Sequence, residues 1–377
     1  MIKRSLRFVF GELDGPLLTI AVLLLAAGLT VLYSATIDSP GRFNDQLRNI
    51  AVALLIMWVA AQIPPQLLMR IAVPVYLIGT ALLVAVFLFG VTKKGAQRWL
   101  YLGFTTIQPS ELMKIAMPLM IAWYFHRREA LVRARDYAIA AVLLLVPVLL
   151  IAKQPDLGTA LLVLAAGLYV IFFAGLSWKL IIPVLLAGVV AVCGLLYFED
   201  SACQPDAAWP GLKDYQKHRI CTLLDPTTDP LGKGFHTIQS TIAVGSGGIT
   251  GKGWLNGTQT HLEFIPERHT DFIFAVYAEE FGLLGNVFLL LLYTWLIVRG
   301  LMIAAGAPTL FARLLAGAIT MIFFTYAFVN MGMVSGILPV VGVPLPLVSY
   351  GGTALVTLFL GIGILMSIQR HRKLVQT

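Results

Sequence analysis

The stretch FIFAVYAEEFGLLGNVFLLLLYTWLIV, residues 272–298, decides the fold class of this chain. It carries only two charged residues, Glu279 and Glu280. A helix needs about 20 apolar residues to cross the roughly 30 Å hydrocarbon core of a bilayer. Because lipid offers no hydrogen bonds, the backbone of such a segment has to satisfy its polar groups internally, as a helix does. The stretch therefore predicts a membrane-spanning α-helix.

The composition of the whole chain agrees with a membrane protein. Hydrophobic residues make up 58% of the 377 residues, charged residues make up 12%, and the mean hydropathy is +0.85. Soluble domains carry roughly twice that charged fraction. The sequence predicts an all-α polytopic membrane protein, a single domain over residues 1–377. It has about ten spans, at 17–36, 47–63, 71–90, 112–125, 137–152, 157–174, 180–197, 272–298, 311–334 and 354–368.

The positions of Lys and Arg predict the orientation. If the N-terminus is cytoplasmic, fourteen of these residues fall on the cytoplasmic side and six fall in short outer loops. Cytoplasmic loops carry the excess of positive charge in membrane proteins. Both termini are therefore predicted to be cytoplasmic, and the long loop 199–270 to lie outside. The net charge of +8 then reflects topology and anionic lipid, and we expect no nucleic-acid partner.

Asp271 is the first candidate for a functional residue. It follows the polar residues PERHT, 266–270, and directly precedes the apolar run. An ionisable residue where water gives way to hydrocarbon is costly, and by default it suggests a functional site. The alternative is a polar anchor that ends the loop, and these six residues alone do not decide between the two readings.

A second group of candidates carries positive charge against the expected pattern. Arg98 lies in an outer loop, Lys114 lies inside the next predicted helix, and Lys153 lies at the outer end of another. Together with Arg268 they predict a cationic cluster suited to a phosphate or pyrophosphate group. The alternative is that each side chain extends to the lipid headgroups.

Polar and helix-breaking residues interrupt the apolar runs at other places. Glu111 precedes Lys114 by three residues, so the two share a helix face and can neutralise each other. Asp156 follows a proline between two predicted helices. The segment GILPVVGVPLP, 336–346, is apolar but rich in Pro and Gly. Such backbone is tolerated at membrane depth only where protein buries it or where it lines a cavity, so we predict a re-entrant segment over about 336–352.

The segment GSGGITGKG, 245–253, superficially suggests a phosphate-binding loop. It lacks the required spacing and no strand precedes it, so we expect a flexible loop. The sequence has no clustered Cys and His residues of the kind that bind zinc, and it predicts no metal site.

Four motifs in the same order resemble the SEDS family (shape, elongation, division and sporulation). They are QPSE at 108–111, QPDLGT at 154–159, LEFIPERHTDFIFAV at 262–276 and PLVSYGG at 346–352. The segment KKGAQRW at 93–99 resembles the part of the family that precedes the fourth helix. Residues 267–270 and 333–339 resemble the RodA branch, which acts in elongation, rather than the FtsW branch, which acts in division. Residues 199–209 differ from the RodA pattern.

The resemblance implies a peptidoglycan glycosyltransferase of the bacterial inner membrane, with its active site facing the periplasm. The substrate is lipid II, the undecaprenyl-pyrophosphate-linked disaccharide pentapeptide, which is polymerised into β-1,4 glycan strands during elongation. Asp271 is then the candidate general base for the acceptor hydroxyl. The predicted substrate-binding residues, which include cations for the departing pyrophosphate, are Arg98, Glu111, Lys114, Lys153, Asp156, Arg268 and Ser349.

The resemblance also implies partners: a class B penicillin-binding protein, which is a transpeptidase, and other elongation proteins such as MreC and MreD. A divalent cation, Mg²⁺ or Mn²⁺, between Asp271 and the pyrophosphate stays open, although no ligand cluster supports it. Two alternative functions remain. The chain is a lipid II flippase, because charges and broken helices at membrane depth also mark transporters, or it is a non-catalytic scaffold of the elongation complex.

Two of the three cysteines, Cys203 and Cys221, lie in the loop predicted to be outside. The periplasm oxidises paired thiols, so we predict a disulfide between them, and the alternative is two free thiols. Closing a loop of about twenty residues stabilises a fold by roughly 3 kcal/mol in the chain-entropy model. Cys193, in a predicted helix, is expected to stay reduced.

Overall fold

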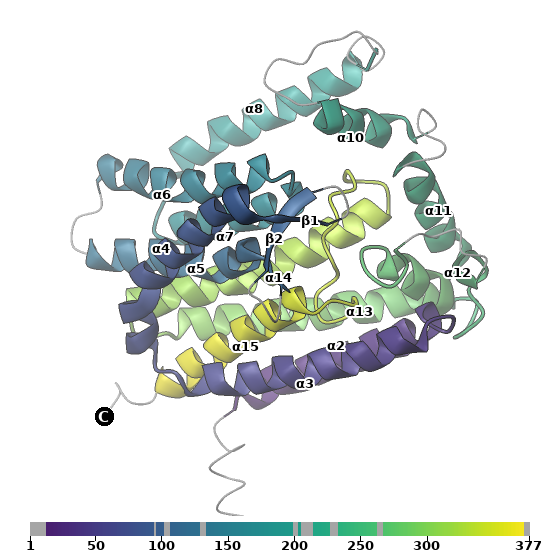
Figure 1. The fold of residues 1–377 in the computed structure, drawn as a ribbon, viewed down its shortest axis with the longest axis horizontal. Helices are drawn as coiled ribbons and strands as arrows, with labels where there is room; N and C mark the ends of the chain where they lie inside the picture. The colour runs from purple at the N-terminus through teal and green to yellow at the C-terminus, as the bar shows by residue number, and fades with distance from the viewer. Residues whose placement is uncertain are drawn as a thin grey trace, which may run out of the picture. The chain divides into compact units, whose positions relative to one another are not determined.

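A computed structural model describes residues 13–93, 96–101, 106–128, 133–198, 203–204, 214–226, 233–261 and 267–372. Parts of the predicted loop 199–270 and of the motifs at 93–99 and 262–276 therefore lie outside the described residues. The helices (Figure 1) are α2 (Gly15–Ala35), α3 (Pro40–Gln62), α4 (Pro65–Phe89), α5 (Pro109–Arg127), α6 (Ala134–Lys153), α7 (Leu157–Phe173), α8 (Trp178–Tyr197), α10 (Asp214–Leu224), α11 (Lys233–Ser246), α12 (Thr258–His261), α13 (Ile273–Ala305), α14 (Leu310–Val334) and α15 (Thr353–His371).

Each of the ten predicted spans coincides with one helix, α2 to α8 in the first half and α13 to α15 in the second. Seven of the described helices, α2, α4, α6, α8, α13, α14 and α15, are long and apolar enough to cross a membrane. Helices α3 and α5 begin with polar residues, and α7 has only 17 residues. The chain is a polytopic helical membrane protein, and the exact number of crossings stays a prediction.

One predicted outer loop has regular structure of its own. Between α4 and α5 the chain forms the short strands β1 (Val91–Lys93), β2 (Ala96–Tyr101) and β3 (Thr106–Ile107). They pair antiparallel in the order β1-β2-β3. The sequence does not predict this sheet, because strands this short give no periodic signal. The sheet matters for the site because β2 carries Arg98.

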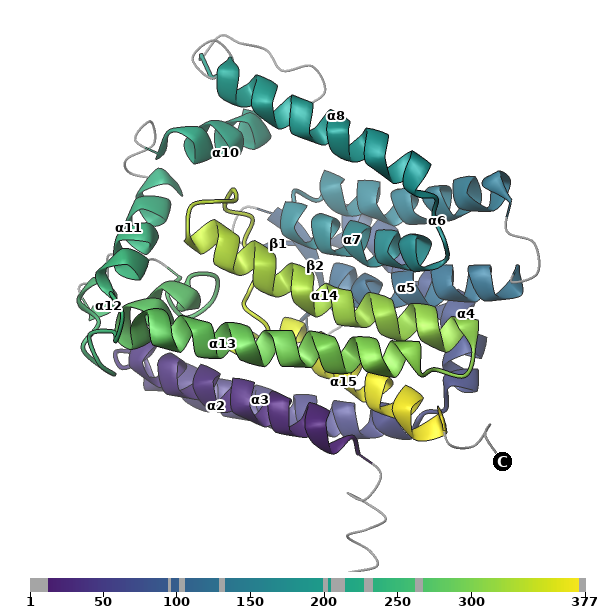
Figure 2. The ribbon, with the colours of Figure 1, turned by 180° about the vertical axis from the view of Figure 1, so that it is seen from behind.

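The described residues group into two compact units, and the prediction of a single domain over 1–377 stays a prediction. The first unit consists of Met1–Ala174, Leu289–Ala327 and Pro346–Thr377. In it, α15 packs along α3, and α5 packs against α4, α6 and α7, as Figure 2 shows from behind. Almost every residue from Pro109 to Phe125 of α5 is buried. This burial gives α5 a protein environment in which polar side chains can find partners.

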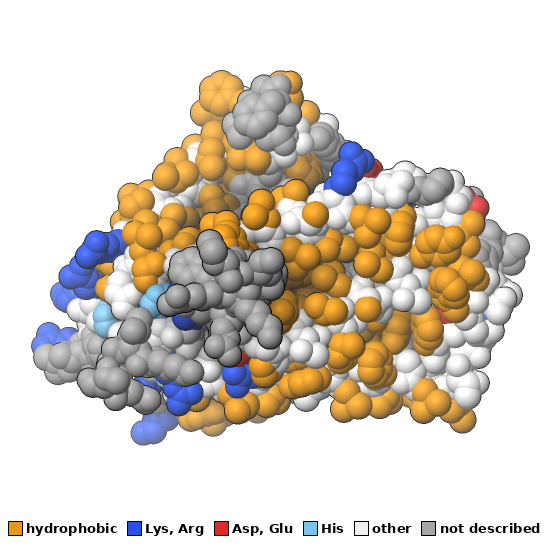
Figure 3. All heavy atoms as spheres, turned by 90° about the horizontal axis from the view of Figure 1, so that it is seen from below, with side chains coloured by type: hydrophobic (Ala, Val, Ile, Leu, Met, Phe, Trp, Pro, Cys, Tyr) orange, Lys and Arg blue, Asp and Glu red, His pale blue; other side chains and the backbone are white. Residues whose placement is uncertain are grey.

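The outer helices of the first unit expose hydrophobic side chains, as lipid-facing surfaces do. Val22 on α2 is 51% exposed, Leu55 on α3 is 60% exposed and Leu149 on α6 is 59% exposed. In Figure 3 hydrophobic side chains cover much of the face on which α2 and α3 lie. A soluble monomer rarely exposes an apolar surface of this extent.

The second unit consists of Gly175–Phe288 and Phe328–Leu345. It contains α8, α10, α11, α12, the beginning of α13 and the end of α14. The segment from Gly336 to Leu345 is not helical, as the sequence predicts, and both Gly336 and Gly342 have positive φ (73° and 76°). That this segment lies at membrane depth stays a prediction.

Helix α13 is interrupted within the second unit at Gly282, which has φ 63° and ψ −159°. The break leaves carbonyl groups before it and N–H groups after it without partners inside the helix. Residues 247–253, here called the glycine segment, form hydrogen bonds with these groups. The glycine segment makes four backbone hydrogen bonds with α13: Lys252 N to Glu279 O (3.0 Å), Gly253 N to Glu280 O (3.0 Å), Leu283 N to Gly248 O (2.9 Å) and Leu284 N to Ile249 O (3.1 Å). The prediction of a flexible loop here was wrong, because the segment is hydrogen-bonded to the backbone on both sides of the break in α13.

Two glycines in this segment allow a test of the close contact with α13. Gly251 (φ 81°) and Gly248 (φ 57°) both have left-handed backbone. A Cβ on Gly251 would lie 2.1 Å from Glu280 O, whereas a Cβ on Gly248 would meet nothing within 4 Å. We expect Gly248→Ala to cost about 1 kcal/mol from backbone strain alone. We expect Gly251→Ala to cost on the order of 3 kcal/mol, because the carbonyl must move and lose its hydrogen bond. Thermal unfolding of the two purified variants measures the difference, and equal costs would contradict the close contact.

Candidate functional site

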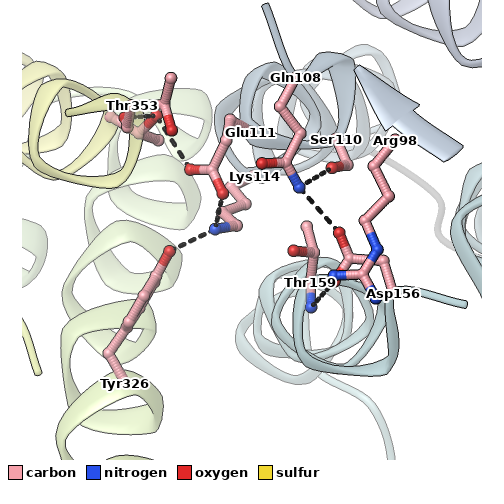
Figure 4. Close-up of polar contacts among 10 residues, drawn as sticks. Arg98, Gln108, Ser110, Glu111, Lys114, Asp156, Thr159, Tyr326 and Thr353 are labelled. Atoms are coloured by element: carbon pink, nitrogen blue, oxygen red, sulfur yellow. Dashed lines mark hydrogen bonds and ion pairs between the residues drawn. The ribbon is translucent and has the colours of Figure 1, made fainter. Parts of the chain in front are cut away.

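The first group of predicted site residues surrounds Asp156, which begins α7 in the first unit (Figure 4). The Asp156 carboxylate caps the helix by accepting a hydrogen bond from Thr159 N at 3.3 Å, and it accepts a second from Gln108 Nε2 at 2.8 Å. Arg98 Nη1 lies 3.8 Å from Asp156 Oδ1, and Arg98 also donates to the carbonyl of Pro155. Asp156 is thus bonded to β2, to the residue before α5 and to the first turn of α7. This arrangement fixes three separated motifs in one place.

The second group is a buried ion pair on α5. Lys114 Nζ lies 2.6 Å from Glu111 Oε1 and also donates to the hydroxyl of Tyr326 on α14. Lys114 is 2% exposed and Glu111 is 9% exposed. Thr357 Oγ1, on α15, is 3.4 Å from the other Glu111 oxygen. The predicted pairing of Glu111 with Lys114 is confirmed.

These contacts show that two of the cations predicted to form a cluster are each paired with a carboxylate. Within the first unit, Arg98 is already paired with Asp156, and Lys114 is buried and paired with Glu111. Lys153 is exposed at the end of α6, and the ion pairs among the described residues do not include it. The structure therefore brings Arg98 to Asp156 and Lys114 to Glu111, whereas it gives Lys153 no ion pair among the described residues. Their roles in binding a substrate stay predictions.

Ser349 belongs to the same unit and follows the Pro- and Gly-rich segment. Its side chain is buried. The backbone around it is held by Gln46 of α3, whose Nε2 donates to Ser349 O at 3.3 Å and whose Oε1 accepts from Gly351 N at 3.2 Å. Gln46, itself 2% exposed, was missed by the sequence analysis.

Asp271 lies in the second unit at the end of a turn that leads into α13. Thr270 N donates to Glu267 O at 2.9 Å, and α13 begins two residues after Asp271. Asp271 is half-buried. The predicted residue Arg268 lies in the same turn and is also half-buried. The turn therefore places a carboxylate at the start of a membrane helix, as the sequence predicts.

Two further residues of the second unit surround Asp271 and were missed. Asn330 Nδ2, on α14, donates to Asp271 O at 2.8 Å and to Val343 O at 2.7 Å. A Cβ on Gly342 would lie 3.3 Å from Asp271 Oδ2, so the carboxylate lies beside the non-helical segment. An asparagine within the apolar run 311–334 was the available signal, since polar residues in membrane helices are rare and need partners.

Glu279, on the first part of α13, is fully buried, and its carboxylate is bonded by the glycine segment and by α12. Its Oε1 accepts from Lys252 Nζ at 2.7 Å, from Thr258 Oγ1 at 3.0 Å and from Gln259 N at 3.1 Å. This carboxylate thus holds the glycine segment and α12 against α13. These contacts favour a structural role for Glu279 over a catalytic one.

The described residues contain no group of three or more His, Cys, Asp or Glu side chains that is suited to a metal ion. The donors described around Asp271 do not fit a protein-held divalent cation, so we derive no step through one. A cation bound jointly by Asp271 and a pyrophosphate stays a prediction.

The structure joins Cys203 to Cys221 by a disulfide, and Cys193 is a free, exposed cysteine of α8. We expect thiol labelling of the denatured protein to detect one reactive cysteine before reduction and three after it. Three reactive thiols before reduction would rule the bond out and would argue against an oxidising location for this loop.

The fold and these residues define a polytopic membrane protein with a carboxylate at a helix boundary and a buried network of ionised side chains. The family model of the cell cycle proteins FtsW, RodA and SpoVE matches residues 16–374. The chain belongs to this family, the SEDS family.

Individual relatives agree over nearly the whole chain. The peptidoglycan glycosyltransferase MrdB of Escherichia coli K12 is 53% identical over 363 residues, which cover 96% of this chain and 95% of MrdB. A chain of a peptidoglycan synthase complex, studied for the coordination of polymerization and crosslinking, has a TM-score of 0.78 and 35% identity and covers 97% of this chain and 99% of its own. The rod shape determining protein RodA of Thermus thermophilus has a TM-score of 0.70 and 30% identity, with 96% and 97% covered. The predicted membership of the RodA branch is confirmed.

Proposed function

We propose that this chain is a peptidoglycan glycosyltransferase that polymerises lipid II into glycan strands during cell elongation. The observation that carries the proposal is the 53% identity to the Escherichia coli glycosyltransferase over 96% of the chain. Proteins that are similar over their whole length usually share the type of reaction, even where their substrates differ in detail. Here 96% of this chain and 95% of MrdB are matched.

Asp271 is the general base in this proposal. A β-1,4 bond formed from an α-linked lipid donor requires inversion at the anomeric carbon. The acceptor hydroxyl attacks that carbon, the bond to the pyrophosphate oxygen breaks, and the hydroxyl proton passes to the Asp271 carboxylate. A positioned base typically contributes about 10²- to 10⁴-fold to the rate. The half-buried position of Asp271 at the start of α13 supports this role.

The pyrophosphate leaves with its negative charge, and cationic side chains stabilise that charge best where water is excluded. We assign this role to Arg98, Lys114 and Arg268. Glu111 and Asp156 hold Lys114 and Arg98 by the ion pairs described above. Lys153 and Ser349 complete the proposed substrate-binding set. The site faces the periplasm in this proposal, in agreement with the distribution of Lys and Arg.

A polymerisation assay in detergent tests the proposal against the flippase and the scaffold. In micelles no bilayer separates two pools of lipid II, so transport has no meaning, whereas polymerisation still proceeds. We expect the purified chain, alone or with its transpeptidase, to convert lipid II into glycan strands. Absence of polymer under both conditions would refute the enzyme and favour one of the two alternatives.

We also propose that the chain works with a class B penicillin-binding protein, and with elongation proteins such as MreC and MreD. The similar chain in a peptidoglycan synthase complex supports a crosslinking partner. Helices associate in membranes through close packing of small residues and interhelical hydrogen bonds. We expect co-purification with the cognate transpeptidase to raise the polymerisation rate, and equal rates with and without it would argue against activation.

A further inference from the structure

We propose that Asn330 is a positioning residue for the reaction, which holds the backbone of Asp271 and the non-helical segment 336–345 in one fixed arrangement. The inference rests on the proposed function, because it concerns the placement of the general base. Asn330 belongs to the second unit, as do both of its partners.

The geometry of the Asn330 amide carries the proposal. Its NH₂ group has two hydrogens, and the two acceptors within reach are Asp271 O at 2.8 Å and Val343 O at 2.7 Å. Asn330 is fully buried. A buried amide donor is costly unless it is bonded, and both hydrogens of this NH₂ group are bonded here. One side chain of α14 therefore ties together two segments that lie far apart in the sequence.

The second segment matters because it borders the carboxylate. Gly342, next to Val343, has φ 76°, and a Cβ there would lie 3.3 Å from Asp271 Oδ2. The Val343 bond thus fixes the backbone beside the carboxylate, while the Asp271 bond fixes the residue that carries it. The two bonds together limit the positions that the carboxylate can take.

The chemistry requires such a limit. A base accelerates proton transfer only when it lies within hydrogen-bond reach of the attacking hydroxyl. A misplacement of about 1 Å in a catalytic group can cost on the order of 10²-fold in rate. Asn330 bonds the backbone of Asp271 rather than its carboxylate, so it acts through Asp271 and does not itself exchange a proton in the reaction.

The test begins with Asn330→Leu, which keeps the approximate size of the side chain and removes both donors. Asn286→Leu on α13 is the matched control, because it makes the same change at a half-buried asparagine of the same unit. We expect Asn330→Leu to lower kcat for lipid II polymerisation about 10- to 100-fold and to leave KM within about twofold. We expect Asn286→Leu to retain the normal kcat.

If Asn330 only stabilised the fold, its loss would also lower activity. A second measurement therefore separates a positioning role from a structural role. In Asp271→Glu the carboxylate is already displaced by one methylene, and positioning by Asn330 has less to contribute. If Asn330 acts through Asp271, Asn330→Leu should cost less than about threefold in that background, since coupled residues are not additive. The thermal unfolding temperature of each purified variant shows whether that variant is folded at the assay temperature.

Two results would overturn the inference: a normal kcat in folded Asn330→Leu, or the same fold-loss in the wild-type and Asp271→Glu backgrounds. Failure of the proposed function has a different signature. If the chain is not a polymerase, the wild type itself forms no glycan from lipid II. If only the assignment of Asp271 as the base fails, Asp271→Asn polymerises lipid II at a normal rate, whatever residue is placed at position 330.

Discussion

Asp271→Asn is expected to abolish polymerisation while the protein still folds. The substitution keeps the size of the side chain and the backbone bond from Asn330 to Asp271 O, but an amide cannot accept the hydroxyl proton. Loss of a general base lowers the rate by about 10²- to 10⁴-fold. The measurement is the initial rate of glycan formation from lipid II by the purified variant, compared with the wild type at equal protein concentration.

Lipid binding and thermal unfolding are the controls for this experiment. Both should stay near the wild-type values, because the substitution preserves the shape of the side chain and Asp271 is only half-buried. A rate within tenfold of the wild-type rate would show that Asp271 is not the base. Loss of activity together with loss of folding would instead assign Asp271 a structural role at the start of α13.

The largest expected effect on stability comes from breaking the Glu111–Lys114 pair. In Glu111→Leu the Lys114 ammonium, which is 2% exposed, loses its carboxylate and keeps the Tyr326 hydroxyl as its hydrogen-bond partner. Removing one partner of a buried ion pair typically costs about 3 to 5 kcal/mol. We expect Glu111→Leu to lower the thermal stability of the purified protein strongly.

Two matched variants make this result interpretable. The double variant Glu111→Leu/Lys114→Met replaces the whole pair by apolar side chains and is expected to recover most of the stability. The pair Asp45 and Arg48 has the same spacing but is exposed, with 44% and 77% of the side chains accessible. Asp45→Ala should therefore change stability by less than about 1 kcal/mol. A double variant as unstable as Glu111→Leu would contradict the argument.

The double variant also separates stability from catalysis. If Lys114 contributes to pyrophosphate stabilisation, the stable double variant should still polymerise slowly. A normal rate in it would limit the Glu111–Lys114 pair to a structural role and would leave Arg98 and Arg268 as the proposed cationic ligands.

The sequence predicted those parts of the fold that depend on neighbouring residues. The apolar runs indicated the positions of α2 to α8 and of α13 to α15, because hydrophobicity sustained over about 20 residues is a local property. The pairing of Glu111 with Lys114 was also predictable, since residues three apart on a helix face the same side. Asp271 was identifiable by its place at the edge of an apolar run.

The missed features all depend on residues that are distant in the sequence. Asn330 reaches Asp271 across 59 residues, and Gln46 reaches Ser349 across 303. No periodicity or spacing reports such contacts. The glycine segment was misread for the same reason: its composition indicated mobility, while its role depends on the break at Gly282, which comes much later in the chain.

The break in α13 has a consequence for the way this protein is made. The glycine segment, residues 247–253, precedes Gly282 in the chain, so the ribosome completes it before the broken helix is synthesised. The partners for the four backbone groups around the break are therefore synthesised before the helix that needs them. If the glycine segment followed α13 in the chain, the helix would be made first and its peptide groups at the break would be unpaired. In hydrocarbon each such group costs several kcal/mol. The direction of translation thus favours this architecture, in which the helix closes on a segment that was made first.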